Sequence, residues 1–460
     1  MKSRIFIILY ALICLCVVFS NANRWKDKIL VFDVSGYHLY LPATIIYNDL
    51  GRLTFYTHIN GRYFPGGWLN WNWYEIFDQP TGQRLNKYAI GVSVMECPFF
   101  LIAHGYNLIT KQDLPDGYSL PYQYGAIFSN IFWVAVGLYY LRRALKIYYD
   151  DTIVLLTLIA IALATNLYHY TANSHGMSHP YSFALIAAAV YYTDAWYRNQ
   201  RRNDILMLGL AVGLIVIVRP VNAVFAMVPV LWRVSSLEDL RLRIKLFVAH
   251  YKTILLSLFI FLAIVFIQLG YWKYVTGHWI YNSYNREPFV WSEPRILHGL
   301  FGFRKGWFVY SPIAFIAVLG FINLWRQDKK LTPVLVTYLA ITIYVTFSWW
   351  CWWYGGGFGC RPLVDSLAVV ALPFAAFAKD VMSNRKKIFH IGLVALVVIL
   401  SGLSMFQSYQ TERNIIHSEN MTRKYYWKVF GQWEFSGKYG NYLLDKQYLK
   451  EEHERRKRQK

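Results

Sequence analysis

Two stretches of the chain carry ionisable residues that could take part in a reaction. Asp33 lies in FDVSGYHLYLPATIIYNDLG, and Arg361 follows the glycine-rich GGGFGC, with Asp365 one turn further along. A carboxylate can take a proton from a hydroxyl group, and a guanidinium beside glycines can bind a phosphate together with backbone N–H groups. We expect Asp33 to be catalytic and Arg361 to bind substrate; the alternative for Asp33 is a helix cap or surface position. Asp365 is expected to orient Arg361 or to be its structural partner.

Aromatic and histidine residues near these charges are further candidates for substrate binding. Residues 37–50 predict an amphipathic interfacial helix that carries Tyr37, His38 and Tyr40. The segment YHYTANSHGMSHPYSF holds three histidines, of which His175 is a candidate contact. Neither a carboxylate nor a cysteine accompanies them at a zinc-binding spacing. We predict that no metal site and no cofactor is required, with a divalent cation left open.

Two more cationic segments are expected on the same side of a membrane as Asp33. Arg219 and Asn222 stand in IVRPVN between two short apolar runs, where the alternative is an arginine that only reaches toward the interface. Arg304 and Lys305 stand in LFGFRKGWFVYSP. A basic pair on the outer side opposes the usual orientation of charge, which indicates an anionic partner.

The elements that must position these residues are membrane-spanning helices. The chain has 460 residues, of which 56% are apolar, 18% aromatic and only 16% charged. Its apolar residues occur in long runs, which is typical of a polytopic membrane protein. The net charge of +21 could suggest nucleic-acid binding, but the lysines and arginines cluster at the ends of the apolar runs, as membrane orientation requires. We therefore predict a lipid bilayer as the environment and no nucleic-acid partner.

The apolar runs predict an all-α fold of about eleven transmembrane helices with outer juxtamembrane helices. The run at 88–109 is ambiguous because it contains Glu96, Pro98 and His104. Treating it as interfacial or re-entrant places the basic clusters RRALK, YRNQRR, LRLRIK, WRQDKK and NRKK on the side of the N-terminal MKSR, as the positive-inside rule requires. The expected spans lie near residues 4–20, 121–144, 152–168, 178–196, 204–218, 221–232, 252–273, 307–325, 332–349, 362–378 and 388–406.

This topology divides the chain into a transmembrane domain, residues 1–406, and a basic C-terminal tail, residues 407–460, whose side of the membrane stays open. The first outer loop covers residues 21–120 and holds the interfacial helices. The first run is expected to be an uncleaved helix, with a signal peptide as the alternative.

Several of these segments, in their order, resemble one known family. NKYAIGVSVMECPFF, GYSLPYQYG, SHGMSHPYSFAL, GLIVIVRPVNAV, LFGFRKGWFVYSP and WWCWWYGGGFGCRPLVDSLAVVALPFA are similar to segments of bacterial membrane glycosyltransferases of the GT-C superfamily. The group it resembles is family 39-like, related to protein O-mannosyltransferases and to lipid A aminoarabinose transferases. The resemblance runs from about residue 30 to 405.

The resemblance implies a GT-C fold and an inverting glycosyltransferase that uses a polyprenyl-phosphate sugar. Asp33 matches the family's first-loop aspartate, the general base, and Arg361 matches the arginine of its "fG.R" stretch. The acceptor would be a glycan, lipid or protein hydroxyl. Val34 and Cys360 depart from the family pattern, and Val34 weakens the case for a metal-binding acidic pair.

The implied location is the bacterial inner membrane, with the site on the periplasmic side and a role in glycosylation of the cell envelope. A transporter or flippase of a lipid-linked or anionic substrate is the alternative, because it could also use outer cations and short interrupted helices. A non-catalytic scaffold in an envelope-polysaccharide complex is a third reading.

Overall fold

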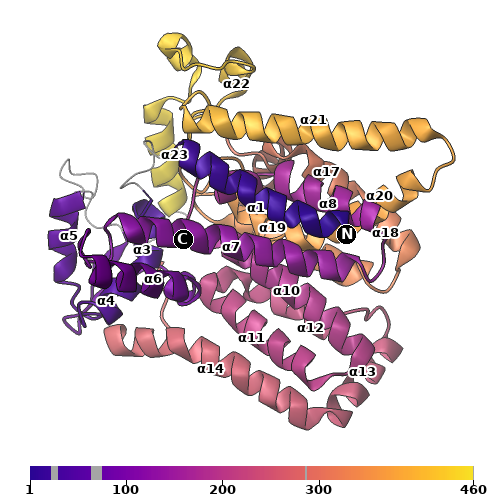
Figure 1. Cartoon of the computed structure of the whole chain (residues 1–460), viewed down its shortest axis with the longest axis horizontal. Helices are drawn as coiled ribbons and strands as arrows, with labels where there is room; N and C mark the ends of the chain where they lie inside the picture. The colour runs from indigo at the N-terminus through magenta and orange to yellow at the C-terminus, as the bar shows by residue number, and fades with distance from the viewer. Residues whose placement is uncertain (22–28, 64–74, 285–286, 459–460) are drawn as a thin grey trace.

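The computed structural model describes residues 1–21, 29–63, 75–284 and 287–458, and this part of the chain is almost entirely helical (Figure 1). Its strands are β1 (Ile76–Asp78) and β2 (Arg84–Asn86), an antiparallel pair. The helices of the first half are α1 (Lys2–Ser20), α3 (Phe32–His38), α4 (Tyr40–Ile45), α5 (Phe55–Tyr63), α6 (Gly91–Thr110), α7 (Leu120–Leu145), α8 (Asp151–Leu163), α9 (Leu167–Ala172), α10 (Ser178–Asn199), α11 (Arg202–Val218), η1 (Pro220–Ala226) and α12 (Met227–Val230).

The second half continues the helical bundle and ends in short helices of the tail. Its helices are α13 (Leu237–Ala249), α14 (Tyr251–Thr276), α15 (Ile296–Phe301), α16 (Trp307–Tyr310), α17 (Pro312–Leu319), α18 (Phe321–Gln327), α19 (Thr332–Ser348), η2 (Arg361–Val364), α20 (Leu367–Met382), α21 (Lys387–Glu412), α22 (Arg423–Val429), η3 (Gly437–Tyr442) and α23 (Lys446–Arg458).

The predicted helical membrane character is seen in the structure. Within the described residues, five helices are long and apolar enough to cross a membrane, namely α1, α6, α7, α14 and α21. Phe259 on α14 and Ile399 on α21 are about two-thirds exposed, as lipid-facing residues would be. Conversely, α20 is buried from Leu367 to Ala376 and forms the centre of the bundle. The chain thus turns apolar side chains both inward and outward, as a membrane protein does.

The segment that was ambiguous in the sequence forms the 20-residue helix α6, which by length and composition qualifies as a span. It packs antiparallel to the first part of α7. The indole of Trp133 donates to the carbonyl of Met95 at 3.0 Å, and the Asn107 amide donates to Ser119 at 3.1 Å. These side-chain bonds join α6 to the stretch that begins α7.

Residues 37–50 do not form the single amphipathic helix that we expected. Helix α3 ends at His38 and α4 covers only Tyr40–Ile45, and the side chains of 37–43 are buried. Pro42 explains the break, because it has no N–H to donate to the carbonyl of His38 four residues earlier. Residues 37–43 are therefore packed inside the protein, whereas residues 44–50 are partly or fully exposed.

The basic clusters meet at one end of the bundle. The N-terminal amino group lies 3.0 Å from Asp151 at the start of α8, and Lys330 lies 2.6 Å from Asp239 on α13. Arg233, after α12, lies 2.7 Å from Asp328, after α18. Figure 1 shows the N-terminus, α13 and α18 toward this same end. We call it the basic end.

Candidate functional site

The opposite end of the bundle brings Asp33 and Arg361 together. Asp33 is in the first turn of α3, and its Oδ2 accepts a hydrogen bond from Nη2 of Arg361 at 2.8 Å. The hydroxyl of Tyr88 donates to Oδ1 of Asp33 at 2.6 Å. The side chains of Asp33 and Arg361 are 19% and 16% exposed. The carboxylate is thus held by two donors and is still reachable from outside.

The glycine-rich loop before Arg361 is shaped by close contact with α9. Gly357 has φ +134°, a backbone conformation that side chains disfavour, and a Cβ there would lie 2.7 Å from the Tyr170 hydroxyl. That hydroxyl donates to the carbonyl of Phe358 and accepts from its N–H, both at 3.0 Å. The loop is therefore fixed to Tyr170 three residues before Arg361.

The charge of Arg361 is stabilised by its neighbours. Burial by itself disfavours a charged guanidinium, but the Asp33 carboxylate and nearby tyrosines outweigh this and raise the pKa of Arg361 above its ordinary value. A permanently charged guanidinium in a mostly buried place can bind a phosphate or stabilise negative charge that develops in a reaction.

Asp365 forms a second, fully buried centre on the other side of η2. Its Oδ1 lies 2.9 Å from Nδ1 of His179, and its Oδ2 lies 3.0 Å from Nε of Arg219. The Asn222 amide also donates to Oδ2 at 2.8 Å. Asp365 is 1% exposed, so these partners compensate its buried charge. The sequence left open whether Asp365 orients Arg361 or is its structural partner. In the structure, the arginine that Asp365 contacts is Arg219.

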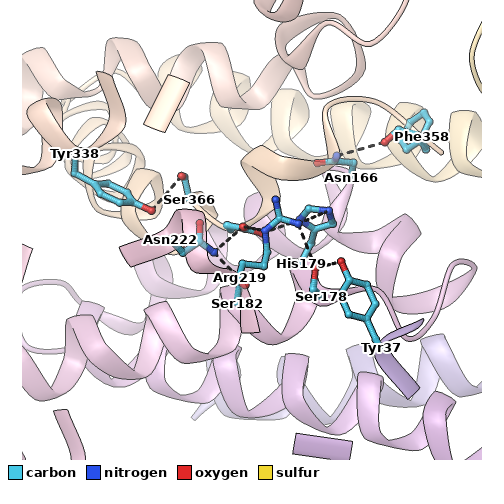
Figure 2. Close-up of polar contacts among 11 residues, drawn as sticks. Tyr37, Asn166, Ser178, His179, Ser182, Arg219, Asn222, Tyr338, Phe358 and Ser366 are labelled. Atoms are coloured by element: carbon cyan, nitrogen blue, oxygen red, sulfur yellow. Dashed lines mark hydrogen bonds and ion pairs between the residues drawn. The ribbon is translucent and has the colours of Figure 1, made fainter. Parts of the chain in front are cut away.

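Local sequence explains why Arg219 and Asn222 reach Asp365. Pro220 disfavours helix in the residue before it, and Arg219 is extended, with φ −147° and ψ 103°, so α11 ends at Val218. Figure 2 shows Arg219 lying between His179 and Asn222. Asn222 also donates to the hydroxyl of Ser182 on α10 at 3.2 Å. The turn after α11 is thereby joined to α10.

A row of polar side chains connects the two carboxylate centres, and Figure 2 shows its part from Arg219 through Ser178 to Tyr37. Nη1 of Arg219 donates to the Ser178 hydroxyl at 3.2 Å, and this hydroxyl donates to the oxygen of Tyr37 at 3.1 Å. The ring of Tyr37 packs on that of Tyr88, with centroids 4.6 Å apart, and Tyr88 bonds Asp33. Asp33, Tyr37, Arg219, Asn222, Arg361 and Asp365 thus belong to one connected region.

His38 and Tyr40 lie behind this region. The ring of His38 is 2.8 Å from Glu96 through Nδ1 and 2.8 Å from the carbonyl of Gly117 through Nε2, and the residue is fully buried. The Tyr40 hydroxyl donates to the carbonyl of Tyr88. Both side chains bond to backbone carbonyls of the first loop, at Gly117 and Tyr88. These hydrogen bonds do not involve the side chains of Asp33 or Arg361.

Arg304 and Lys305 join the glycine-rich loop to the C-terminal tail. The Lys305 ammonium donates to the carbonyls of Gly357 and Ser418. Arg304 donates to the carbonyl of Glu419 at 3.0 Å and lies 3.2 Å from Glu452 of α23. Burial and then the charge of Arg361 lower the pKa of Lys305 to about 7.

The tail, whose side was open, packs at the end of the bundle that holds the site. In addition to the Glu452 contact, Arg456 of α23 donates to the carbonyl of Trp350 at 2.8 Å. Figure 1 shows α23 beside the end of α1 that lies away from the N-terminus. The tail therefore covers part of the loop that precedes Arg361.

The three histidines of the α9 region have separate environments. His169 lies 2.8 Å from the Ser408 hydroxyl, and His179 contacts Asp365. His175 is 3% exposed, and its Nδ1 has no hydrogen-bond partner among the residues that the structure describes. Burial lowers the pKa of His175 to about 4, so its ring is neutral at pH 7. Across the described ranges, no group of three or more His, Cys, Asp or Glu side chains is arranged to hold a metal ion.

Three residues of the region were not assigned a role from the sequence. Tyr88 bonds Asp33, Ser178 joins Arg219 to Tyr37, and Tyr170 holds the glycine-rich loop. Each stands in a segment that the sequence analysis did single out, NKYAIG or YHYTANSHGMSH, but tyrosine and serine are too common for their type alone to indicate a site. Their role depends on contacts between distant segments.

Comparison with protein-family models and curated proteins finds no match.

Proposed function

We propose that the chain is a membrane glycosyltransferase that moves a sugar from a polyprenyl-phosphate donor to an acceptor hydroxyl, with inversion at the anomeric carbon and Asp33 as the general base. The observation that supports this most directly is the contact between Asp33 and Arg361 at 2.8 Å, with both side chains partly exposed. A proton acceptor beside a phosphate-binding cation is what such a transfer needs.

The ion pair is the resting arrangement in this proposal. When the donor binds, its phosphate competes for Arg361, and the guanidinium turns some of its N–H groups toward the phosphate. Asp33 keeps the hydrogen bond from Tyr88 and gains an oxygen that can accept a proton. Donor binding therefore prepares the base as well as the leaving group.

The transfer itself is a single in-line displacement. The acceptor oxygen forms a bond to the anomeric carbon on one face of the sugar, while the bond between that carbon and the phosphate oxygen breaks on the other. The electron pair of the broken bond leaves with the polyprenyl phosphate, whose added negative charge Arg361 stabilises. The acceptor proton passes to Asp33, and the configuration at the anomeric carbon inverts.

We place the reaction at the outer face of a bacterial inner membrane. The grouping of the N-terminus, Arg233 and Lys330 at the basic end supports this, because basic clusters remain on the cytoplasmic side. In this orientation α6 is an outer juxtamembrane helix, and the remaining apolar runs form about eleven spans, several of them interrupted.

The proposal is tested with the purified full-length protein in vesicles that contain a radiolabelled polyprenyl-phosphate sugar. A panel of hexose and pentose donors is incubated with membrane extract as the source of acceptor. Wild type should transfer label to an acceptor, and Asp33→Asn should lower kcat by about 10²- to 10⁴-fold with little change in KM. Asp78→Asn is the matched control, because the side chain of Asp78 is 90% exposed.

Other outcomes of the same assay would reject this function. Movement of the labelled donor between leaflets without formation of a new glycosidic bond would support a flippase. Transfer by Asp33→Asn at the wild-type rate would exclude Asp33 as the base. Where transfer occurs, the anomeric configuration of the product is determined by NMR, and retention would contradict the single displacement.

A further inference from the structure

A hollow of about 310 Å³ lies at the basic end, far from Asp33 along the bundle. It is formed by the last turns of α10, the connection from α12 to α13, and one face of α13. The residues that matter to its chemistry are Asp194, Arg198, Trp232, Arg233, Asp239 and Arg243. No step of the proposed transfer uses them.

The carboxylates of this hollow are already neutralised by cations. Asp194 lies 2.7 Å from Arg198, and Asp239 lies 2.6 Å from Lys330. Arg233 has its own carboxylate in Asp328, at 2.7 Å. The hollow therefore does not favour a cation as its ligand.

Arg243 is a cation of this hollow whose contacts in the described structure include no carboxylate. Its guanidinium lies 3.6 Å from the ring centroid of Tyr197, and its Nη2 donates to the carbonyl of Trp232. The ring and the carbonyl hold the group in place without cancelling its charge. The positive charge of Arg243 is thus oriented and available to an anion.

Donors without an acceptor gather at the same place. Nε1 of Trp232, Nε of Arg233 and Nη1 of Arg243 are buried and have no hydrogen-bond partner in the described structure. Trp232 is 2% exposed. Because buried donors are normally paired, these three unpaired donors, one of them on the uncompensated guanidinium of Arg243, indicate an acceptor with several oxygens and a negative charge. A phosphate group has that chemistry.

The outward face of α13 indicates where such a phosphate comes from. Leu242, which lines the hollow, is 57% exposed, so an apolar side chain borders the hollow toward the outside. Helix α13 leads through His250 directly into the apolar α14. It therefore lies where the chain enters the membrane, with apolar side chains available to acyl chains.

We propose that this hollow binds the phosphate headgroup of an anionic phospholipid from the leaflet at the basic end. Arg243 and Trp232 contact the phosphate, and the acyl chains lie along Leu242 at the edge of the hollow. This lipid is separate from the polyprenyl-phosphate donor, which would bind at the other end of the bundle. The inference does not depend on the proposed glycosyltransferase activity.

The test uses the full-length protein in lipid nanodiscs of phosphatidylcholine with or without phosphatidylglycerol. Native mass spectrometry after transfer to mild detergent counts the phosphatidylglycerol molecules that remain bound, and a thermal scan gives the unfolding midpoint. Wild type should retain phosphatidylglycerol and unfold at a higher temperature when it is present. Arg243→Gln should weaken retention by about tenfold or more, the effect of losing a charged hydrogen bond.

Two further variants keep this test decisive. Arg241→Gln removes the same charge from an exposed position on α13 and should retain the lipid like wild type. Trp232→Phe removes the Nε1 donor with little change of shape, so it tests the site even where Arg243→Gln unfolds, and it should also weaken retention. Equal retention by wild type, Arg243→Gln and Trp232→Phe would overturn the proposal.

A last arm separates the lipid from free phosphate. Inorganic phosphate is added to the protein in phosphatidylcholine nanodiscs at the concentration that phosphatidylglycerol reaches in the other discs. The lipid assignment predicts no shift of the unfolding midpoint under this condition. A shift as large as that from phosphatidylglycerol, lost in Arg243→Gln, would mean that the hollow binds soluble phosphate and would overturn the assignment to a lipid.

Discussion

Asp33 and Arg361 are 328 positions apart in the chain and bond each other at 2.8 Å at the end of the bundle opposite to the basic clusters. The contact joins the first short helix after the first span to the loop before α20. In the proposed function this contact links the proton acceptor with the phosphate-binding group, and both side chains are partly accessible to solvent. The consequences of this contact, and of the groups that support it, can be measured separately.

The ion pair should contribute to stability as well as to chemistry. A double-mutant cycle of Asp33→Asn and Arg361→Gln should give a coupling free energy of about 1–3 kcal/mol, since a charged hydrogen bond in a mostly buried place is lost. The unfolding free energy of the four proteins in mixed micelles measures it. A coupling near zero would show that the two side chains do not interact in the folded protein.

Removal of the Tyr88 hydroxyl should change the pH dependence of transfer. The hydroxyl donates to the charged carboxylate of Asp33, so Tyr88→Phe should raise the pKa of that carboxylate. The acidic limb of kcat/KM against pH should move upward by about one pH unit, while the basic limb stays in place. An unchanged acidic limb would mean that Tyr88 does not act on the base.

Gly357 should be sensitive even to alanine. Gly357→Ala should destabilise the protein by about 1–3 kcal/mol, because it combines a disfavoured φ of +134° with a clash against the Tyr170 hydroxyl. Gly392→Ala on α21, where a Cβ meets nothing within 4 Å, is the control and should be neutral or stabilising. Thermal unfolding of these variants measures each effect.

Acid should destabilise the protein partly through His175. Its pKa is lowered to about 4 by burial, whereas an unfolded chain binds the proton near pH 6.5. Stability from this residue is therefore complete above pH 6.5 and is lost toward pH 4, at about 1.4 kcal/mol per pH unit. His175→Asn should show a shallower fall of the unfolding midpoint between pH 7 and pH 5. His169, whose pKa is also lowered by burial, leaves a residual slope.

The sequence alone was sufficient to predict the helical membrane character. The count of about eleven spans stays a prediction, because five helices of the described residues, α6 among them, are long and apolar enough to cross a membrane. Long apolar runs are a local property, so each of the runs from 4–20 to 388–406 lies on one helix or on a short series of helices. The charge pattern also predicted that the basic clusters lie on one side. The start of α1 does contact the start of α8, and the residues that follow α12 and α18 contact each other. The prediction from local pattern was wrong at residues 37–50. Pro42 interrupts the helix, and the side chains of residues 37–43 are buried instead of lying on a surface.

Only the tertiary structure decided which charges are partners. Asp365 is one turn from Arg361 in the sequence, but packing of η2 against α10 turns it toward His179 and Arg219. Arg361 bonds Asp33 through the fold of the first loop, and Arg304 and Lys305 bond the tail. The physical reason is that apolar runs specify helices through nearby residues, whereas a buried ion pair depends on how distant helices pack and on which partner compensates the cost of burying each charge.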